Sequence, residues 1–73
     1  MTTLYSKPGC QPCRMTKRLL ESENIPHVVI DVTQTPEALE VVTGLGYQSL
    51  PVIVAGDQHW NGFRPDRVKA LAA

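Results

Sequence analysis

The chain has 73 residues, and its seven basic and seven acidic residues give a formal net charge of zero. This length predicts a single domain, residues 1–73, with a thin core, and the neutral balance gives no indication of a nucleic-acid partner. No stretch approaches the roughly 20 apolar residues of a membrane span, and the N-terminus lacks a signal-peptide pattern, so we expect a cytoplasmic protein without a membrane partner. We also expect a monomer.

The first predicted elements are a strand and a helix joined by a turn. Residues 2–6 are rich in β-formers and are stopped by Lys7-Pro8-Gly9. A helix is predicted from Gln11 to about Glu23, with Pro12 tolerated because it lies in the first turn. The side chains expected to point inward are Met15, Thr16, Leu19 and Leu20.

A second strand and a second helix follow. The run from Val28 to Val32 is nearly all β-branched, which is typical of a strand covered on both faces. Thr35-Pro36-Glu37 begins a helix with a hydroxyl cap, a proline and an acid in the first turn, and Gly46 is a plausible stop. The inward side chains of this helix are expected to be Ala38, Leu39, Val42 and Leu45.

The last third of the chain predicts a hairpin and a final helix. The strands are Pro51–Ala55 and Gln58–Trp60, with Gly56-Asp57 as the tight turn, and the helix runs from about Pro65 to Leu71. The element order is therefore β-α-β-α-β-β-α. A four-stranded mixed sheet with three helices on its two faces is the minimal arrangement of the thioredoxin/glutaredoxin fold, in the α/β class.

Cys10 and Cys13 are the only cysteines, and they stand where the first strand passes into the first helix. Cys10 lies at the helix entrance, where unpaired N–H groups and the helix dipole favour an anion. Thiols in such CxxC motifs have pKa values of roughly 3.5 to 7.5, against about 8.5 for a free thiol. We therefore expect Cys10 to attack as a thiolate and Cys13 to resolve the mixed disulfide.

A structural crosslink and a zinc site are the alternatives for this pair. A disulfide across so short a loop stabilises weakly, because the entropic effect grows with loop length. A zinc site would need two more ligands, and the spacing of His27 and His59 fits no usual histidine pair. A metal cluster bound jointly by two chains remains an open alternative for this pair.

The charges are unevenly distributed along the chain. Four cations and no acid fall in the first twenty residues, and five acids follow with no base among them. The cations are Lys7, Arg14, Lys17 and Arg18, and the acids are Glu21, Glu23, Asp31, Glu37 and Glu40. A solvated helix face explains any one of these charges, but together the cations surround the dithiol, favour a thiolate and could steer an acidic partner.

Two prolines bear on the dithiol. Pro12 lacks an N–H that could donate to the Cys10 sulfur, so we hypothesise a less stabilised thiolate and a more reducing protein. Pro51 opens a strand in Ser49-Leu50-Pro51-Val52, where thioredoxin-like proteins carry a cis-proline. A proline at a strand start is commonplace, but here it would pack against the disulfide and present the preceding backbone to a partner's extended segment.

Two segments together resemble the NrdH-type redoxins, which are glutaredoxin-like proteins of the thioredoxin superfamily. Residues 7–13 (KPGCQPC) look like a glutaredoxin-type active site. Residues 60–66 (WNGFRPD) are similar to the signature that closes the sheet in NrdH-type redoxins. The dithiol motif is moderately specific, the second motif is highly specific, and the resemblance extends over essentially the whole chain.

The resemblance implies a thiol–disulfide oxidoreductase that takes electrons from thioredoxin reductase, fed by NADPH, and passes them to class Ib ribonucleotide reductase. It implies that Cys10 and Cys13 carry the chemistry as a redox-active disulfide without a bound cofactor or metal, and that Pro51 is the cis-proline. Residues that would support the site or contact partners are Lys7, Gln11, Pro12, Leu50, Trp60, Gly62, Phe63, Arg64 and Asp66.

The chain departs from the family pattern at three places. Gln11-Pro12 stands where members usually have a hydrophobic residue and then glutamine, Asn61 replaces the usual serine, and Leu50 precedes Pro51 where a smaller residue is common. These changes leave the dithiol mechanism intact and bear on the reduction potential and the partner. Trp60 and Phe63 also have a simpler explanation, as a hydrophobic cover for a small core.

Three rival functions follow from the same residues. A glutathione-dependent glutaredoxin would need a charged grip on the carboxylates of the tripeptide, to which Lys7 could contribute. The segment Phe63-Arg64-Pro65-Asp66, however, differs from a glutaredoxin-like carboxylate-binding turn. The other rivals are a general protein disulfide reductase and an iron–sulfur or metal carrier in which Cys10 of two chains bridges a cluster.

Overall fold

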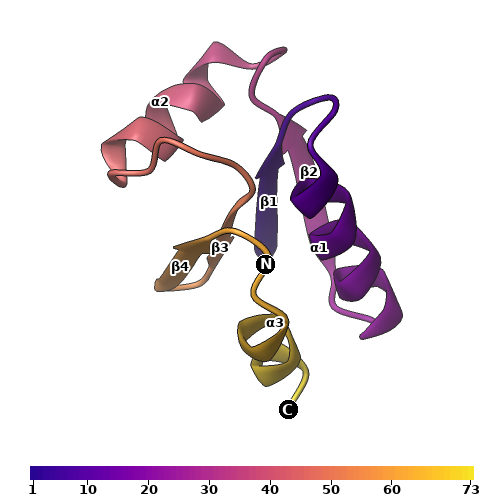
Figure 1. The fold of residues 1–73 in the computed structure, drawn as a ribbon. Helices are drawn as coiled ribbons and strands as arrows, with labels where there is room; N and C mark the ends of the chain where they lie inside the picture. Colours follow the sequence, from indigo (N-terminus) through magenta and orange to yellow (C-terminus); the bar gives the residue numbers. More distant parts are fainter.

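The seven elements follow the predicted order in the computed structural model, which describes residues 1–73 (Figure 1). The strands are β1 (Thr2–Ser6), β2 (His27–Asp31), β3 (Val52–Ala55) and β4 (Gln58–Asn61). The helices are α1 (Gln11–Ser22), α2 (Pro36–Gly44) and α3 (Pro65–Ala72). Each helix has a proline in its first turn, where the missing N–H costs no helical hydrogen bond.

The four strands form one mixed sheet in the order β2-β1-β3-β4. Strand β1 pairs parallel with β2 and antiparallel with β3, and β3 pairs antiparallel with β4. The β3–β4 turn places Gly56 at a φ of +63°, a conformation that suits glycine. The predicted fold class is confirmed, and the end of β1 leads directly to the dithiol.

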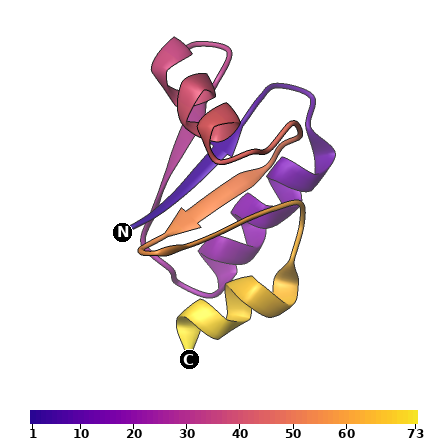
Figure 2. The ribbon, with the colours of Figure 1, turned by 90° about the vertical axis from the view of Figure 1, so that its left-hand side faces the viewer.

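Helices cover both faces of the sheet (Figures 1 and 2). Helices α1 and α3 pack on one face, where the buried side chains are Leu4, Leu20, Ile53, Ala55, Trp60 and Val68. Helix α2 packs on the other face, where the buried side chains are Val32, Ala38, Val42 and Val52. None of the three helices has the length and apolar character needed to span a bilayer.

The expectation that the second strand is covered on both faces is wrong. Strand β2 lies at an edge of the sheet, with Val28 45% and Val29 40% exposed. Two helical side chains predicted to point inward are also exposed, Met15 at 43% and Leu39 at 48%. Each stands beside a smaller residue, Thr16 or Ala38, that takes the buried position, so hydrophobicity alone misplaces the inward face.

Candidate functional site: a dithiol at a helix entrance

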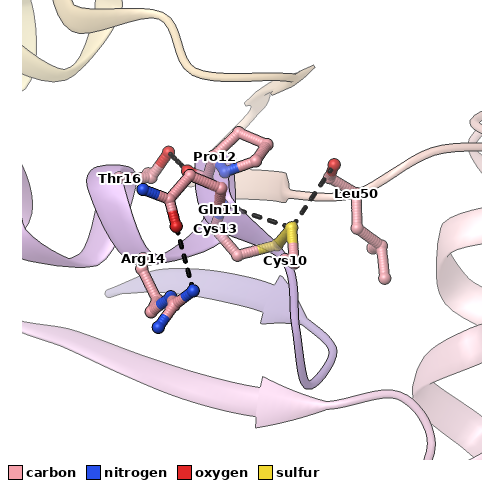
Figure 3. The surroundings of a disulfide bond; sticks show 7 residues. All are labelled: Cys10, Gln11, Pro12, Cys13, Arg14, Thr16 and Leu50. Carbon is pink, nitrogen blue, oxygen red and sulfur yellow. Dashed lines mark hydrogen bonds between the residues drawn. A yellow bond between two sulfur atoms is a disulfide. The ribbon is translucent and has the colours of Figure 1, made fainter.

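Cys10 is the N-cap residue of α1 and forms a disulfide with Cys13, with 5.2 Å between their Cα atoms. The backbone N–H of Cys13 donates to Cys10 Sγ at 3.2 Å, so this sulfur occupies the place of a capping side chain (Figure 3). The sulfur thus faces the positive end of the helix, as the sequence predicts. Pro12 stands between the two cysteines and supplies no N–H of its own.

Two side-chain hydrogen bonds hold the segment that carries the dithiol. Thr16 is fully buried, and its Oγ1 donates to the carbonyl oxygen of Pro12 at 2.8 Å. Arg14 Nη2 donates to Gln11 Oε1 at 2.9 Å on the exposed side (Figure 3). The buried hydroxyl is therefore satisfied within the helix, which allows a polar residue to pack directly beneath the redox site.

The Leu50–Pro51 peptide bond is cis, and this segment lies against the dithiol. The carbonyl oxygen of Leu50 is 3.8 Å from Cys10 Sγ (Figure 3). In the disulfide the sulfur has no proton to donate, so this is a van der Waals contact that a thiol could turn into a hydrogen bond. Pro51 is fully buried, and its carbonyl oxygen accepts a hydrogen bond from the Gly62 N–H at 2.9 Å.

Two side-chain hydrogen bonds join the loop before Pro51 to β4, and neither was predicted from the sequence. Asn61 Nδ2 donates to Ser49 Oγ at 2.8 Å. Tyr47 Oη and His59 Nδ1 form a hydrogen bond of 2.7 Å, with the two rings edge to face. No local signal could have revealed these pairs, because their members stand on separate elements and meet only when the hairpin folds.

Two hollows open beside the dithiol. One, of about 310 Å³, lies between α2 and the loop before Pro51, and its lining includes Lys7, Tyr47 and Leu50. The other, of about 200 Å³, lies under the start of α1, and its lining includes Lys7, Cys13 and Lys17. Lys7 thus lines both hollows.

The residues of the WNGFRPD segment are divided between three places. Trp60 is 3% exposed in the core, and the Arg67 guanidinium lies 4.8 Å from the centre of its ring. Phe63 is half-buried and shares a surface hollow with Arg18 and Leu19 of α1. Arg64 Nε and Asp66 Oδ1 are 3.6 Å apart at the start of α3. Of this segment, Gly62 bonds directly to the proline beside the dithiol.

The two histidines lie on different elements and have separate partners. His27 Nδ1 is 2.8 Å from the carbonyl oxygen of Ile25, and His59 meets Tyr47 as described above. No group of three His, Cys, Asp or Glu side chains gathers in the structure.

Comparisons with known proteins all find similarity to glutaredoxin-type proteins. The sequence model of the Glutaredoxin family matches residues 2–60. The chain is 41% identical over 69 residues to the glutaredoxin-like protein NrdH of Escherichia coli, covering 94% of this chain and 85% of that protein. It is 38% identical over 72 residues to the glutaredoxin-like protein NrdH of Lactococcus lactis, covering 99% and 100%.

A solved structure agrees with these sequence comparisons. The NrdH-redoxin of Escherichia coli, described as having a thioredoxin-like activity profile, superposes with a TM-score of 0.92 at 40% identity. The superposition covers 96% of this chain and 92% of that one.

Proposed function

The chain belongs to the glutaredoxin family, among its NrdH-type redoxins, and is a thiol–disulfide oxidoreductase; on this premise we propose that it carries electrons from thioredoxin reductase to class Ib ribonucleotide reductase. The observation that carries the proposal is the likeness to NrdH proteins over nearly the whole chain, dithiol and WNGFRPD segment included. In this role the protein works as a monomer in the cytoplasm, without a bound cofactor other than its own disulfide.

The proposed cycle moves two electrons through Cys10 and Cys13. The Cys10 thiolate attacks one sulfur of the acceptor's disulfide, forming a mixed disulfide and releasing the acceptor's other sulfur as a thiolate. Cys13, as its thiolate, then attacks Cys10 Sγ, which forms the Cys10–Cys13 disulfide and releases the acceptor as a dithiol after proton uptake. Thioredoxin reductase, which NADPH keeps reduced, then reduces the Cys10–Cys13 disulfide by the same kind of thiol–disulfide exchange.

The surroundings of each sulfur support Cys10 as the attacking thiol and Cys13 as the resolving thiol. Cys10 Sγ accepts the Cys13 N–H and lies at the positive end of α1, which favours its anion. Both cysteines are buried, Cys10 at 6% and Cys13 at 3% exposure, so the position of Cys10 at the helix entrance, and not exposure, supports its role as the attacking thiol. The Leu50 backbone beside Cys10 is placed to face an extended segment of the acceptor.

The start of α3 favours the thioredoxin-reductase route over glutathione. Asp66 places a carboxylate in the first turn of this helix, and Arg64 is already paired with it. Pro65 has no N–H, and the N–H of Arg67 is donated to the Arg64 carbonyl oxygen at 3.1 Å. A helix start with its own acid and few free donors is a poor site for the carboxylates of a tripeptide.

The deciding experiment compares two electron sources. Oxidised protein is supplied with NADPH and either thioredoxin reductase or glutathione with glutathione reductase, and NADPH consumption is followed. We expect consumption with thioredoxin reductase and none above background for Cys10→Ser, which keeps the fold but lacks the attacking sulfur. Consumption in the glutathione system alone would overturn the assignment, and class Ib ribonucleotide reductase activity in the coupled system tests the acceptor.

A further inference from the structure

The four cations of the first twenty residues extend from the loop before α1 to the second half of this helix, and none of them has a carboxylate partner. Lys7, Arg14 and Lys17 line one hollow with Cys13, and Arg14 and Arg18 line a smaller one of about 90 Å³. All four cations are exposed, and the single ion pair of the chain lies elsewhere. We call Lys7, Arg14, Lys17 and Arg18 the basic face.

The basic face is unfavourable for the helix that bears it. The positive end of a helix dipole favours acidic side chains, and the first turns of α2 and α3 carry Glu37 and Asp66. The first turn of α1 carries no acid, and Arg14 is the fourth residue of this helix. The cations oppose the dipole at this helix end and pair with no carboxylate of the chain, so apart from the Cys10 thiolate any negative charge that they meet comes from a partner.

Exposed apolar side chains lie among these cations. Val29 is 40% exposed and lines the hollow that contains Cys13 and Lys17. Met15 is 43% exposed and lines the smaller hollow with Arg18. A surface of this kind suits an extended polypeptide that carries carboxylates and an apolar side chain better than it suits a purely polar polyanion.

We propose that the basic face docks an acidic segment next to the disulfide of a partner protein, and so selects which disulfides Cys10 meets. The inference rests on the proposed exchange with protein disulfides and adds the chemistry by which a partner is chosen. Electrostatic attraction at this place raises the rate of encounter with the partner and fixes the side from which its disulfide approaches.

The test uses reduced protein and two synthetic peptides that contain the same intramolecular disulfide. One peptide has Asp and Glu beside the disulfide, and the other has Asn and Gln at the same positions. We expect reduction of the acidic peptide to be about tenfold faster than that of the neutral peptide at low salt, with the difference shrinking as salt rises.

Charge reversal locates the effect on the protein. Lys17→Glu should lower the ratio of the two reduction rates, acidic peptide over neutral peptide, about fivefold, with Lys17→Gln in between. Lys69→Glu is the matched control, because Lys69 is an exposed cation in the last turn of α3. It should leave the preference for the acidic peptide within about twofold of wild type.

Three results would overturn the proposal. If Lys17→Glu slows both peptides equally, the charge acts on the thiolate and not on docking. If Lys69→Glu behaves like Lys17→Glu, only net charge matters. If a short oligonucleotide at peptide concentration blocks reduction of the acidic peptide, the face serves a polyanion. The assay contains neither reductase nor NADPH, so its failure is distinguishable from failure of the proposed electron route.

Discussion

At the scale of single residues, the reducing power of the dithiol depends on which N–H groups reach Cys10 Sγ. The structure has one such donor, the N–H of Cys13 at 3.2 Å. Pro12, at the second position of α1, has no N–H to add. Any donor that stabilises the Cys10 thiolate stabilises the reduced protein, so a missing donor keeps the protein more reducing.

We therefore predict that Pro12→Ala raises the reduction potential by about 30 mV. A hydrogen bond to a charged group contributes about 1.5 kcal/mol, which corresponds to roughly 30 mV for a two-electron couple. Pro12→His should move the potential in the same direction. The measurement is equilibration in thiol–disulfide buffers, with Pro8→Ala, an exposed proline outside the helix, as control. An unchanged or lower potential would show that the second position is not aimed at the sulfur.

At the scale of elements, the loop before Pro51 depends on β4 for its position beside the dithiol. Ser49 is held by Asn61, and Pro51 by the backbone of Gly62. These two hydrogen bonds hold the loop beside the dithiol against β4.

A double-mutant cycle tests whether Asn61 and Ser49 interact. We predict a coupling of about 0.5 kcal/mol in the free energy of unfolding between Asn61→Ala and Ser49→Ala, because the hydrogen bond is exposed and water replaces the lost partner in each single variant. The same cycle between Asn61→Ala and the distant Ser22→Ala should be additive. A coupling below roughly 0.3 kcal/mol for the first pair would mean that solvent competes successfully for the bond.

Strand placement gives a second test at this scale. Val28 lies on edge strand β2 at 45% exposure, and Val52 lies on central strand β3 at 0%. The same substitution should therefore have different effects: about 2 kcal/mol of lost stability for Val52→Ala and less than about 1 kcal/mol for Val28→Ala. Urea unfolding of both variants measures the difference, and equal losses would contradict the edge position of β2.

The bounds of the helices and strands, which depend on local sequence, were predicted well. Features that depend on contacts between elements were not. Prolines, turn residues and β-branched runs placed every helix and strand close to its observed bounds, although the Thr35 hydroxyl predicted to cap α2 makes no capping hydrogen bond. The Cys10–Cys13 pair and Pro51 came from spacing and family pattern. The edge position of β2 depends on strand order, which the composition of β2 does not encode. The Asn61–Ser49 hydrogen bond likewise joins two separate segments, so the sequence around neither residue predicts it.

At the scale of the whole molecule, the two cores on either side of the sheet, and not the disulfide, hold the chain together. The disulfide closes a loop of only four residues, for which the chain-entropy model gives about 2 kcal/mol at most. A single buried leucine such as Leu20, at 0% exposure, contributes as much or more, since Leu→Ala changes in cores cost roughly 2 to 5 kcal/mol.

The reduced protein should accordingly stay folded, as a redox carrier must through both halves of its cycle. We predict that excess dithiothreitol lowers the free energy of unfolding by about 2 kcal/mol or less, with the far-ultraviolet circular dichroism unchanged. The Cys10→Ser/Cys13→Ser double variant should match the reduced protein within about 0.5 kcal/mol, because both lack the crosslink without losing core side chains. Urea titrations of the three forms supply the comparison, and loss of the helical signal on reduction would mean that the crosslink, and not the packing of α1 and α3 on the sheet, maintains the fold.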